Sequence, residues 1–137
     1  MQLANAASGW GSNSVTVASY VVSPGPGWPA LQFSDCRAAA ERHGWTVGRE
    51  FTDYTPPGFE RLDLGEQWRM TLRMAESGLL DGIVLHDLTT VTSDTQDYLT
   101  LVNWAADHCT FALVVNGGEY GRDHLIGRRP VTTTAVA

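Results

Sequence analysis

The sequence contains no lysine. All nine of its basic residues are arginine, against fifteen acidic residues, which gives a formal net charge of −6 and an isoelectric point near 5.0. Nucleic-acid binding draws much of its affinity from neutralised phosphates, so a chain this acidic has no general attraction for DNA. A local basic patch is still open, because Arg122, Arg128 and Arg129 gather near the C-terminus. The composition therefore argues against direct DNA binding.

Long apolar runs are also missing, which excludes a membrane span and predicts no membrane partner. No charged segment followed by an apolar one opens the chain, so no secretory signal is visible. The 137 residues have the length of one ordinary domain, and 43% of them are hydrophobic, enough to bury a core. These features together predict a cytoplasmic protein.

Cysteine is scarce as well. The two cysteines, Cys36 and Cys109, lie far apart and fit no metal-ligand spacing. Each has apolar neighbours, so we expect two buried free thiols rather than a disulfide. We expect no metal and no cofactor.

Strand and helix patterns alternate through the middle of the chain. Apolar, often β-branched segments predict strands at residues 15–22, 45–51, 83–85 and 111–115. Helices are expected from about Ser34, from residue 64 or 65, and after Ser93 as N-cap. Such an alternation requires right-handed crossovers with helices on both faces of the sheet. We therefore expect a doubly wound, three-layer α/β domain with a mostly parallel four-stranded sheet.

The boundaries of that domain follow from the flanking composition. Residues 1–14 are small and polar without periodicity and are interpreted as a flexible N-terminal lead. Residues 128–137 are interpreted as a polar C-terminal tail. A single domain is then expected over residues 15–127.

Three segments carry a resemblance to a known family. They are Ser19-Tyr-Val-Val-Ser23 at the end of the first strand, the helix and turn at residues 36–47, and the stretch from Glu76 to Leu88. In order and spacing they resemble the N-terminal catalytic domain of the serine recombinases, the resolvase–invertase family, over about residues 15–115. The resemblance implies a resolvase-like fold. It also places Ser23 at the position of the serine that attacks a DNA phosphodiester.

The family's catalytic charges do not carry over with the fold. The arginine expected two residues before the nucleophile is Val21, the family's Asp is matched by Thr89, and its next two arginines fall on Thr90 and Ser93. Phosphoryl transfer needs cations around the transferring group, and none of these positions supplies one. The sequence therefore predicts a degenerate family member, with Ser23 as a vestigial catalytic candidate only.

The first functional hypothesis is a non-catalytic interaction or regulatory module that self-associates or binds a protein partner. Exposed tryptophans often anchor such contacts. Trp10 in the lead and Trp28 in the first predicted loop are the candidates, whereas Trp45, Trp68 and Trp104 follow core-facing patterns. A homo-oligomer or a protein partner is thus expected.

The alternative hypothesis is a small-molecule-binding protein or small enzyme. Ligands of such folds lie beyond the carboxyl ends of the strands. The polar residues expected to line that crevice are Ser23, Asp87, Thr89, Thr90, Thr92 and Ser93. His86 and Asp87 could also form a hydrolase-like set with Ser23. A working DNA recombinase is the least favoured of these functions.

Overall fold

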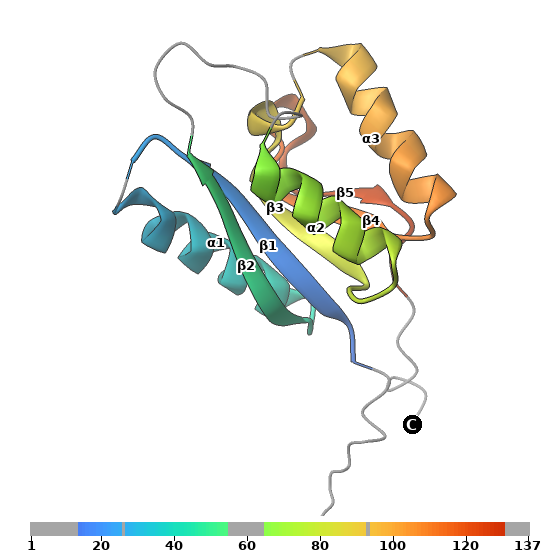
Figure 1. Ribbon diagram of the computed structural model, residues 1–137, viewed down its shortest axis with the longest axis horizontal. Coiled ribbons are helices and arrows are strands. Elements are labelled where there is room, and N and C mark those ends of the chain that lie inside the picture. The colour runs from blue at the N-terminus through green and yellow to red at the C-terminus, as the bar shows by residue number, and fades with distance from the viewer. Residues whose placement is uncertain (1–13, 26, 55–64, 93, 131–137) are drawn as a thin grey trace, which may run out of the picture.

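A computed structural model describes residues 14–25, 27–54, 65–92 and 94–130 of the chain. It has a five-stranded sheet in the order β2-β1-β3-β4-β5, in which β1 to β4 are parallel (Figure 1). The elements are β1 (Thr16–Ser23), α1 (Trp28–Arg42), β2 (Thr46–Tyr54), α2 (Glu66–Glu76), β3 (Gly82–Asp87), the 3-10 turn η1 (Leu88–Thr90), α3 (Thr95–Asp107), β4 (Phe111–Asn116), the 3-10 turn η2 (Gly118–Tyr120) and β5 (Arg122–Gly127). The α/β class and the mostly parallel sheet are confirmed.

The predicted number of strands is wrong, because β5 adds a fifth. It runs antiparallel to β4, with Ala112 opposite Ile126 and Asn116 opposite Arg122. Among its six residues only Ile126 is buried, since β5 lies at the edge of the sheet. An edge strand of this kind needs no continuous apolar pattern, so no local pattern predicts it.

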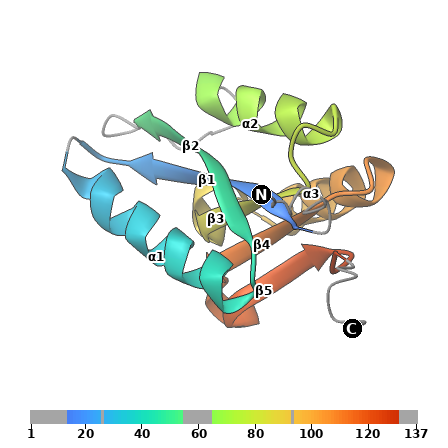
Figure 2. The same ribbon diagram turned by 90° about the horizontal axis from the view of Figure 1, so that it is seen from below.

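Two hydrophobic cores lie on the two faces of the sheet. On one face α1 contributes Cys36, Ala39 and Ala40. On the other face α2 and α3 contribute residues that include Trp68 and Leu101. Figure 2 shows α1 and α2 on opposite sides of the strands. The three-layer arrangement expected from alternating strands and helices is therefore confirmed.

The beginnings of two helices differ from the prediction. α1 begins at Trp28 rather than near Ser34, because Pro29 is tolerated in a first turn, where the missing N–H needs no partner. Trp28 therefore belongs to a helix and not to a loop. The N-cap of α3 is Asp94, whose Oδ1 accepts the backbone N–H of Asp97 at 2.8 Å. The prediction that Ser93 caps α3 is therefore wrong, although Ser93 itself lies outside the described residues.

Several predicted core positions can be compared with the structure. Trp45 and Trp68 are buried, as expected, and Cys36 is a buried free thiol. Trp104 is only half-buried, since its Nε1 reaches out to donate to Glu76 Oε2 at 2.7 Å. Cys109 is exposed rather than buried, because α3 ends before it and the chain turns there with a φ of 53°.

None of the described helices combines the length and the apolar character that crossing a membrane requires. Trp10, one of the two predicted partner contacts, lies outside the described residues.

Candidate binding site at the carboxyl edge of the sheet

The four parallel strands all end at one edge of the sheet. In the strand register Ser23 at the end of β1 pairs with Tyr54 at the end of β2. Asp87 at the end of β3 likewise pairs with Asn116 at the end of β4. Ligands of parallel sheets lie beyond such an edge, so we expect the functional residues here.

Ser23 is fully buried at this edge. Its Oγ donates to the carbonyl oxygen of Gly25 at 2.9 Å, and the Gly25 N–H donates back to Oγ at 3.4 Å. This is a local turn of the kind that serine often forms. Val21, at the position where the resemblance expects an arginine, is buried among apolar side chains. The hydroxyl of Ser23 is thus neither accessible nor next to a cation at position 21.

The hydrolase-like set of His86, Asp87 and Ser23 has no hydrogen bonds among its members. Nε2 of His86 is hydrogen-bonded to Oδ2 of Asp35 on α1 at 3.0 Å. Oδ1 of Asp87 accepts the backbone N–H of Thr89 at 2.9 Å. His86 therefore holds α1, and Asp87 holds η1, against the end of β3. Both interactions have a structural role.

A second network at the edge joins Asp87 to its neighbours. Thr89 Oγ1 donates to Asp87 Oδ1 at 2.8 Å, and Asn116 Nδ2 donates to Asp87 Oδ2 at 3.3 Å. Thr90 Oγ1 donates to the carbonyl oxygen of Asp87 at 2.6 Å. Asp87 thus fixes η1 relative to β3 and β4, and places Thr89 at the rim of an open hollow.

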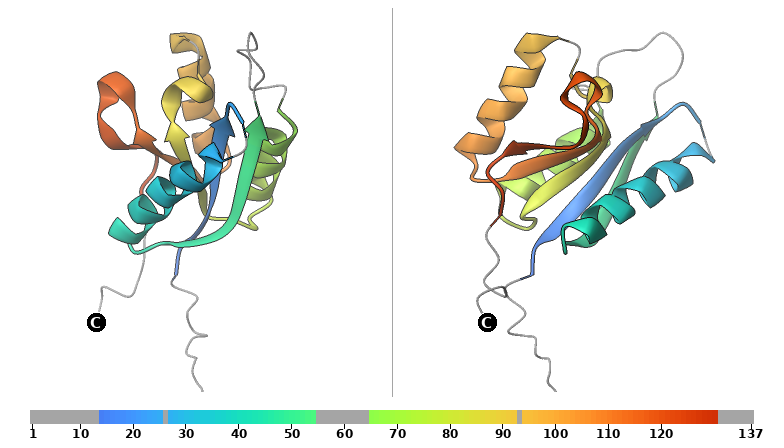
Figure 3. Two further views of the ribbon diagram at one scale, coloured as in Figure 1. Left: turned by 90° about the vertical axis from the view of Figure 1, so that its left-hand side faces the viewer. Right: turned by 180° about the vertical axis from the view of Figure 1, so that it is seen from behind.

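That hollow has a volume of about 330 Å³ and lies between η1, the start of α3 and η2. Figure 3 shows the η2 turn beside η1 at this end of the sheet. Of the predicted crevice residues, Thr89 and Thr92 line the hollow, whereas Ser23, Asp87 and Thr90 do not. Ser93 lies outside the described residues. The other side chains that matter for the chemistry of the hollow are Asp94, Tyr98, Glu119 and Tyr120.

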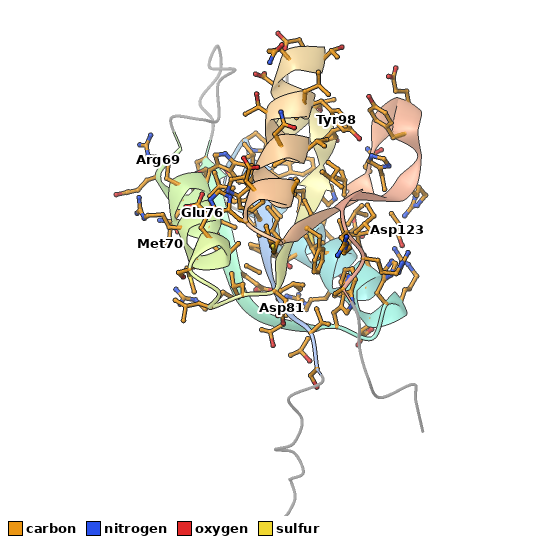
Figure 4. The ribbon with its side chains drawn as sticks, turned by 90° about the vertical axis from the view of Figure 1, so that its right-hand side faces the viewer. Arg69, Met70, Glu76, Asp81, Tyr98 and Asp123 are labelled. Atoms are coloured by element: carbon orange, nitrogen blue, oxygen red, sulfur yellow. The ribbon has the colours of Figure 1, made fainter. Side chains whose placement is uncertain are left out.

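The aromatic group beside this hollow was not predicted from the sequence. Tyr98 on α3, Tyr120 on η2 and His124 on β5 form stacked ring pairs, and the Tyr98 hydroxyl is hydrogen-bonded to His124 Nε2 at 2.8 Å. Figure 4 shows Tyr98 on the side of α3 that faces the loop before β5. Burial, followed by the Tyr120 hydroxyl, raises the pKa of Tyr98. These residues converge only because β5 folds back along β4, and β5 was not predicted.

A third network ties β1 and β2 to α2. Asp53 Oδ2 accepts the Tyr20 hydroxyl at 2.7 Å and the Trp68 N–H at 2.9 Å, while Oδ1 accepts the Gln67 N–H at 3.1 Å. Asp53 therefore caps the first turn of α2 from a neighbouring strand. Burial, reinforced by the Asp53 carboxylate, raises the pKa of Tyr20 far above its usual value.

A larger cavity of about 750 Å³ lies at the opposite edge of the sheet. Its lining includes Val15, Cys109, Phe111 and the arginines Arg128 and Arg129. Within the described part of the chain, no three His, Cys, Asp or Glu residues come together as a metal site would require.

No protein-family model matches the sequence, and no curated protein matches it either.

Proposed function

We propose that this chain is a non-catalytic, resolvase-like interaction module that associates with a second copy of itself. The observation that carries the proposal is the state of Ser23, which is fully buried and hydrogen-bonded to Gly25. A nucleophile must reach its substrate, and a transferring phosphoryl group needs cations nearby. The positions that the family fills with arginine hold Val21, Thr90 and Ser93. The proposal therefore assigns this chain binding without phosphoryl transfer.

An exposed stripe on α1 supports self-association. Trp28 and Leu31 are large apolar side chains that are exposed at 57% and 68%. Asp35, Ala38 and Arg42 are also exposed and continue the row at alternating spacings of three and four residues. This is the spacing with which one helix packs along another. We call these five residues the α1 stripe. Within the chain, Asp35 is hydrogen-bonded to His86 and Arg42 is paired with Asp123.

A second copy of the chain complements the α1 stripe. In the antiparallel register that we propose for two α1 helices across a two-fold axis, Trp28 of one copy lies against Ala38 of the other. A large side chain then fills the space left by a small one, and the contact repeats on both sides of the axis. Because each copy carries a net charge of −6, long-range repulsion opposes the contact, and added salt should strengthen it.

A second candidate function is ligand binding at the strand-end hollow. It is favoured by one observation, the open volume of about 330 Å³ beside Thr89 and Thr92. Ser23 takes no part in this form of the hypothesis, since it does not line the hollow.

Size-exclusion chromatography with light scattering tests self-association. The wild-type chain should approach the mass of a dimer as its concentration and the salt concentration rise. A Trp28→Ser/Leu31→Ser double variant should remain monomeric. Tyr54→Ser is the matched control, because Tyr54 is exposed at 56% but lies on β2, outside the α1 stripe. A wild-type monomer at every concentration, or a dimer that survives the double substitution, would overturn the proposal.

A further inference from the structure

We propose that the hollow between η1, the start of α3 and η2 binds an arginine side chain of a basic protein partner. This inference concerns a different surface from the α1 stripe and does not depend on self-association. It rests on three properties of the lining: its hydrogen-bonding groups, its charge and its exposed aromatic ring.

Two of the threonines at the hollow, Thr89 and Thr92, offer acceptors rather than donors. Thr89 Oγ1 already donates its hydrogen to Asp87 Oδ1 at 2.8 Å, and Thr92 Oγ1 donates to the carbonyl oxygen of Leu88 at 3.1 Å. Each hydroxyl has one hydrogen to give, so what remains on each oxygen is lone pairs. A ligand that meets both oxygens must therefore bring its own donors.

The charge of the lining is negative. Asp94 and Glu119 both line the hollow and are exposed, and no described arginine lines it. The N-terminus of α3 contributes a positive partial charge of about half a unit, which two full carboxylate charges outweigh. The hollow therefore attracts a cation and repels phosphate or carboxylate ligands.

The third property is an uncovered ring. Tyr98 and Tyr120 are nearly parallel, at 7° and with centroids 4.8 Å apart, and Tyr120 and His124 are 4.7 Å apart. The Tyr98 and His124 centroids are themselves only 6.1 Å apart, so the three rings form a triangle and Tyr120 is not sandwiched. Tyr120 is 43% exposed and lines the hollow. Its ring is thus available for a further stacking partner.

A guanidinium group satisfies all three properties at once. It carries a permanent positive charge and five donors without any acceptor, and its planar face stacks on aromatic rings. An ammonium group also carries charge and donors, but it is a compact point charge without a planar face. The acidity of the whole chain favours approach of a basic segment, which makes a protein the natural source of the arginine.

Nuclear magnetic resonance of the full chain tests the inference. The probe is a blocked glycine peptide with one central arginine, and its control has citrulline there, which keeps the shape but loses the charge. Backbone amide signals of Thr89, Gly117, Gly118 and Tyr120 should move with the arginine peptide and stay in place with the citrulline peptide. The affinity should fall as salt is added.

Two variants and one control sharpen the test. Glu119→Gln removes a carboxylate and Tyr120→Leu removes the ring, and each should weaken arginine-peptide binding by about fivefold to tenfold. Glu41→Gln removes an exposed carboxylate from α1 and should leave binding unchanged. The inference is overturned by equal signal movement with citrulline, by none with arginine, or by full binding in both hollow variants. Light scattering on Glu119→Gln should still report a dimer, which separates this result from the test of self-association.

Discussion

The hydroxyl of Tyr20 donates a 2.7 Å hydrogen bond to Oδ2 of Asp53, the same oxygen that accepts the backbone N–H of Trp68. Tyr20 lies on β1 and Asp53 on β2, so one carboxylate joins two strands to the first turn of α2. Asp53, the last residue but one of β2, therefore stabilises the fold through these hydrogen bonds. It is not free to act on a substrate.

Removing the Tyr20 hydroxyl should destabilise the protein without repacking it. Tyr20→Phe keeps the ring but leaves Asp53 with one donor fewer, which should lower the free energy of unfolding by about 1–2 kcal/mol. Urea denaturation measures the change. The control is Tyr54→Phe, because Tyr54 is exposed and should tolerate the loss of its hydroxyl. Equal stability of the two variants would argue that the hydrogen bond between Tyr20 and Asp53 does not stabilise the fold.

Stability should fall at alkaline pH partly because of Cys36. Burial, followed by the nearby Asp35 carboxylate, raises the pKa of the Cys36 thiol to about 12 from an ordinary value of 9.0. Above pH 9 the unfolded chain loses this proton while the folded chain keeps it, so unfolding becomes easier as pH rises toward 12. The slope from this group is at most about 1.4 kcal/mol per pH unit.

Cys36→Ala isolates that contribution. The variant should lose stability at neutral pH, because a buried side chain is shortened, yet its stability should decline less steeply between pH 9 and the onset of alkaline unfolding. Urea titrations at several pH values give both quantities. Parallel pH profiles for the variant and the wild type would show that the thiol does not titrate as described.

Gly82 should tolerate no side chain. A Cβ placed there would lie 2.5 Å from the ring of Phe111. Phe111 is itself buried, and its ring centroid lies 4.8 Å from that of Trp45. Gly82→Ala should therefore cost about 1–3 kcal/mol through overpacking. Gly25→Ala is the matched control, since its Cβ would meet nothing within 4 Å. Thermal unfolding compares the two, and similar melting temperatures would contradict the packing described for β3.

Cys109 occupies a backbone position that glycine prefers. It follows the C-cap of α3 with a φ of 53°, where an L-residue is strained. Cys109→Gly should raise the free energy of unfolding by about 0.5–1 kcal/mol, the strain relief being partly offset by the greater freedom of glycine in the unfolded chain. Cys109→Ala keeps the strain and should change little. If alanine stabilises as much as glycine, the strain is not the cause.

The parts of the fold that the sequence predicted are those with an unambiguous local pattern. Residues 83–85 and 111–115 are continuous apolar runs, and both are buried central strands. The start of α1 was not predicted, because Pro29 is a residue typical of loops. The whole of β5 was not predicted, because it has the largely polar sequence of an edge strand. A local residue pattern does not predict an element whose structure is decided by pairing with distant parts of the chain.

The candidate site likewise combines residues that the sequence predicts and residues that it does not. Thr89 and Thr92 could be placed near a strand end from sequence, because loops after buried strands collect at one edge. Tyr120 and His124 could not, since their meeting with Tyr98 depends on the antiparallel return of β5. No local sequence pattern predicts a contact between residues that an unpredicted strand brings together.

Cysteine cross-linking across the α1 stripe is the most direct test of self-association through α1. In a Cys109→Ser background, a Trp28→Cys protein is mixed with an Ala38→Cys protein and oxidised. A disulfide-linked dimer should form more readily in the mixture than in either protein alone, because antiparallel packing brings position 28 of one copy to position 38 of the other. A mixture that yields no more dimer than the separate proteins would contradict self-association through α1.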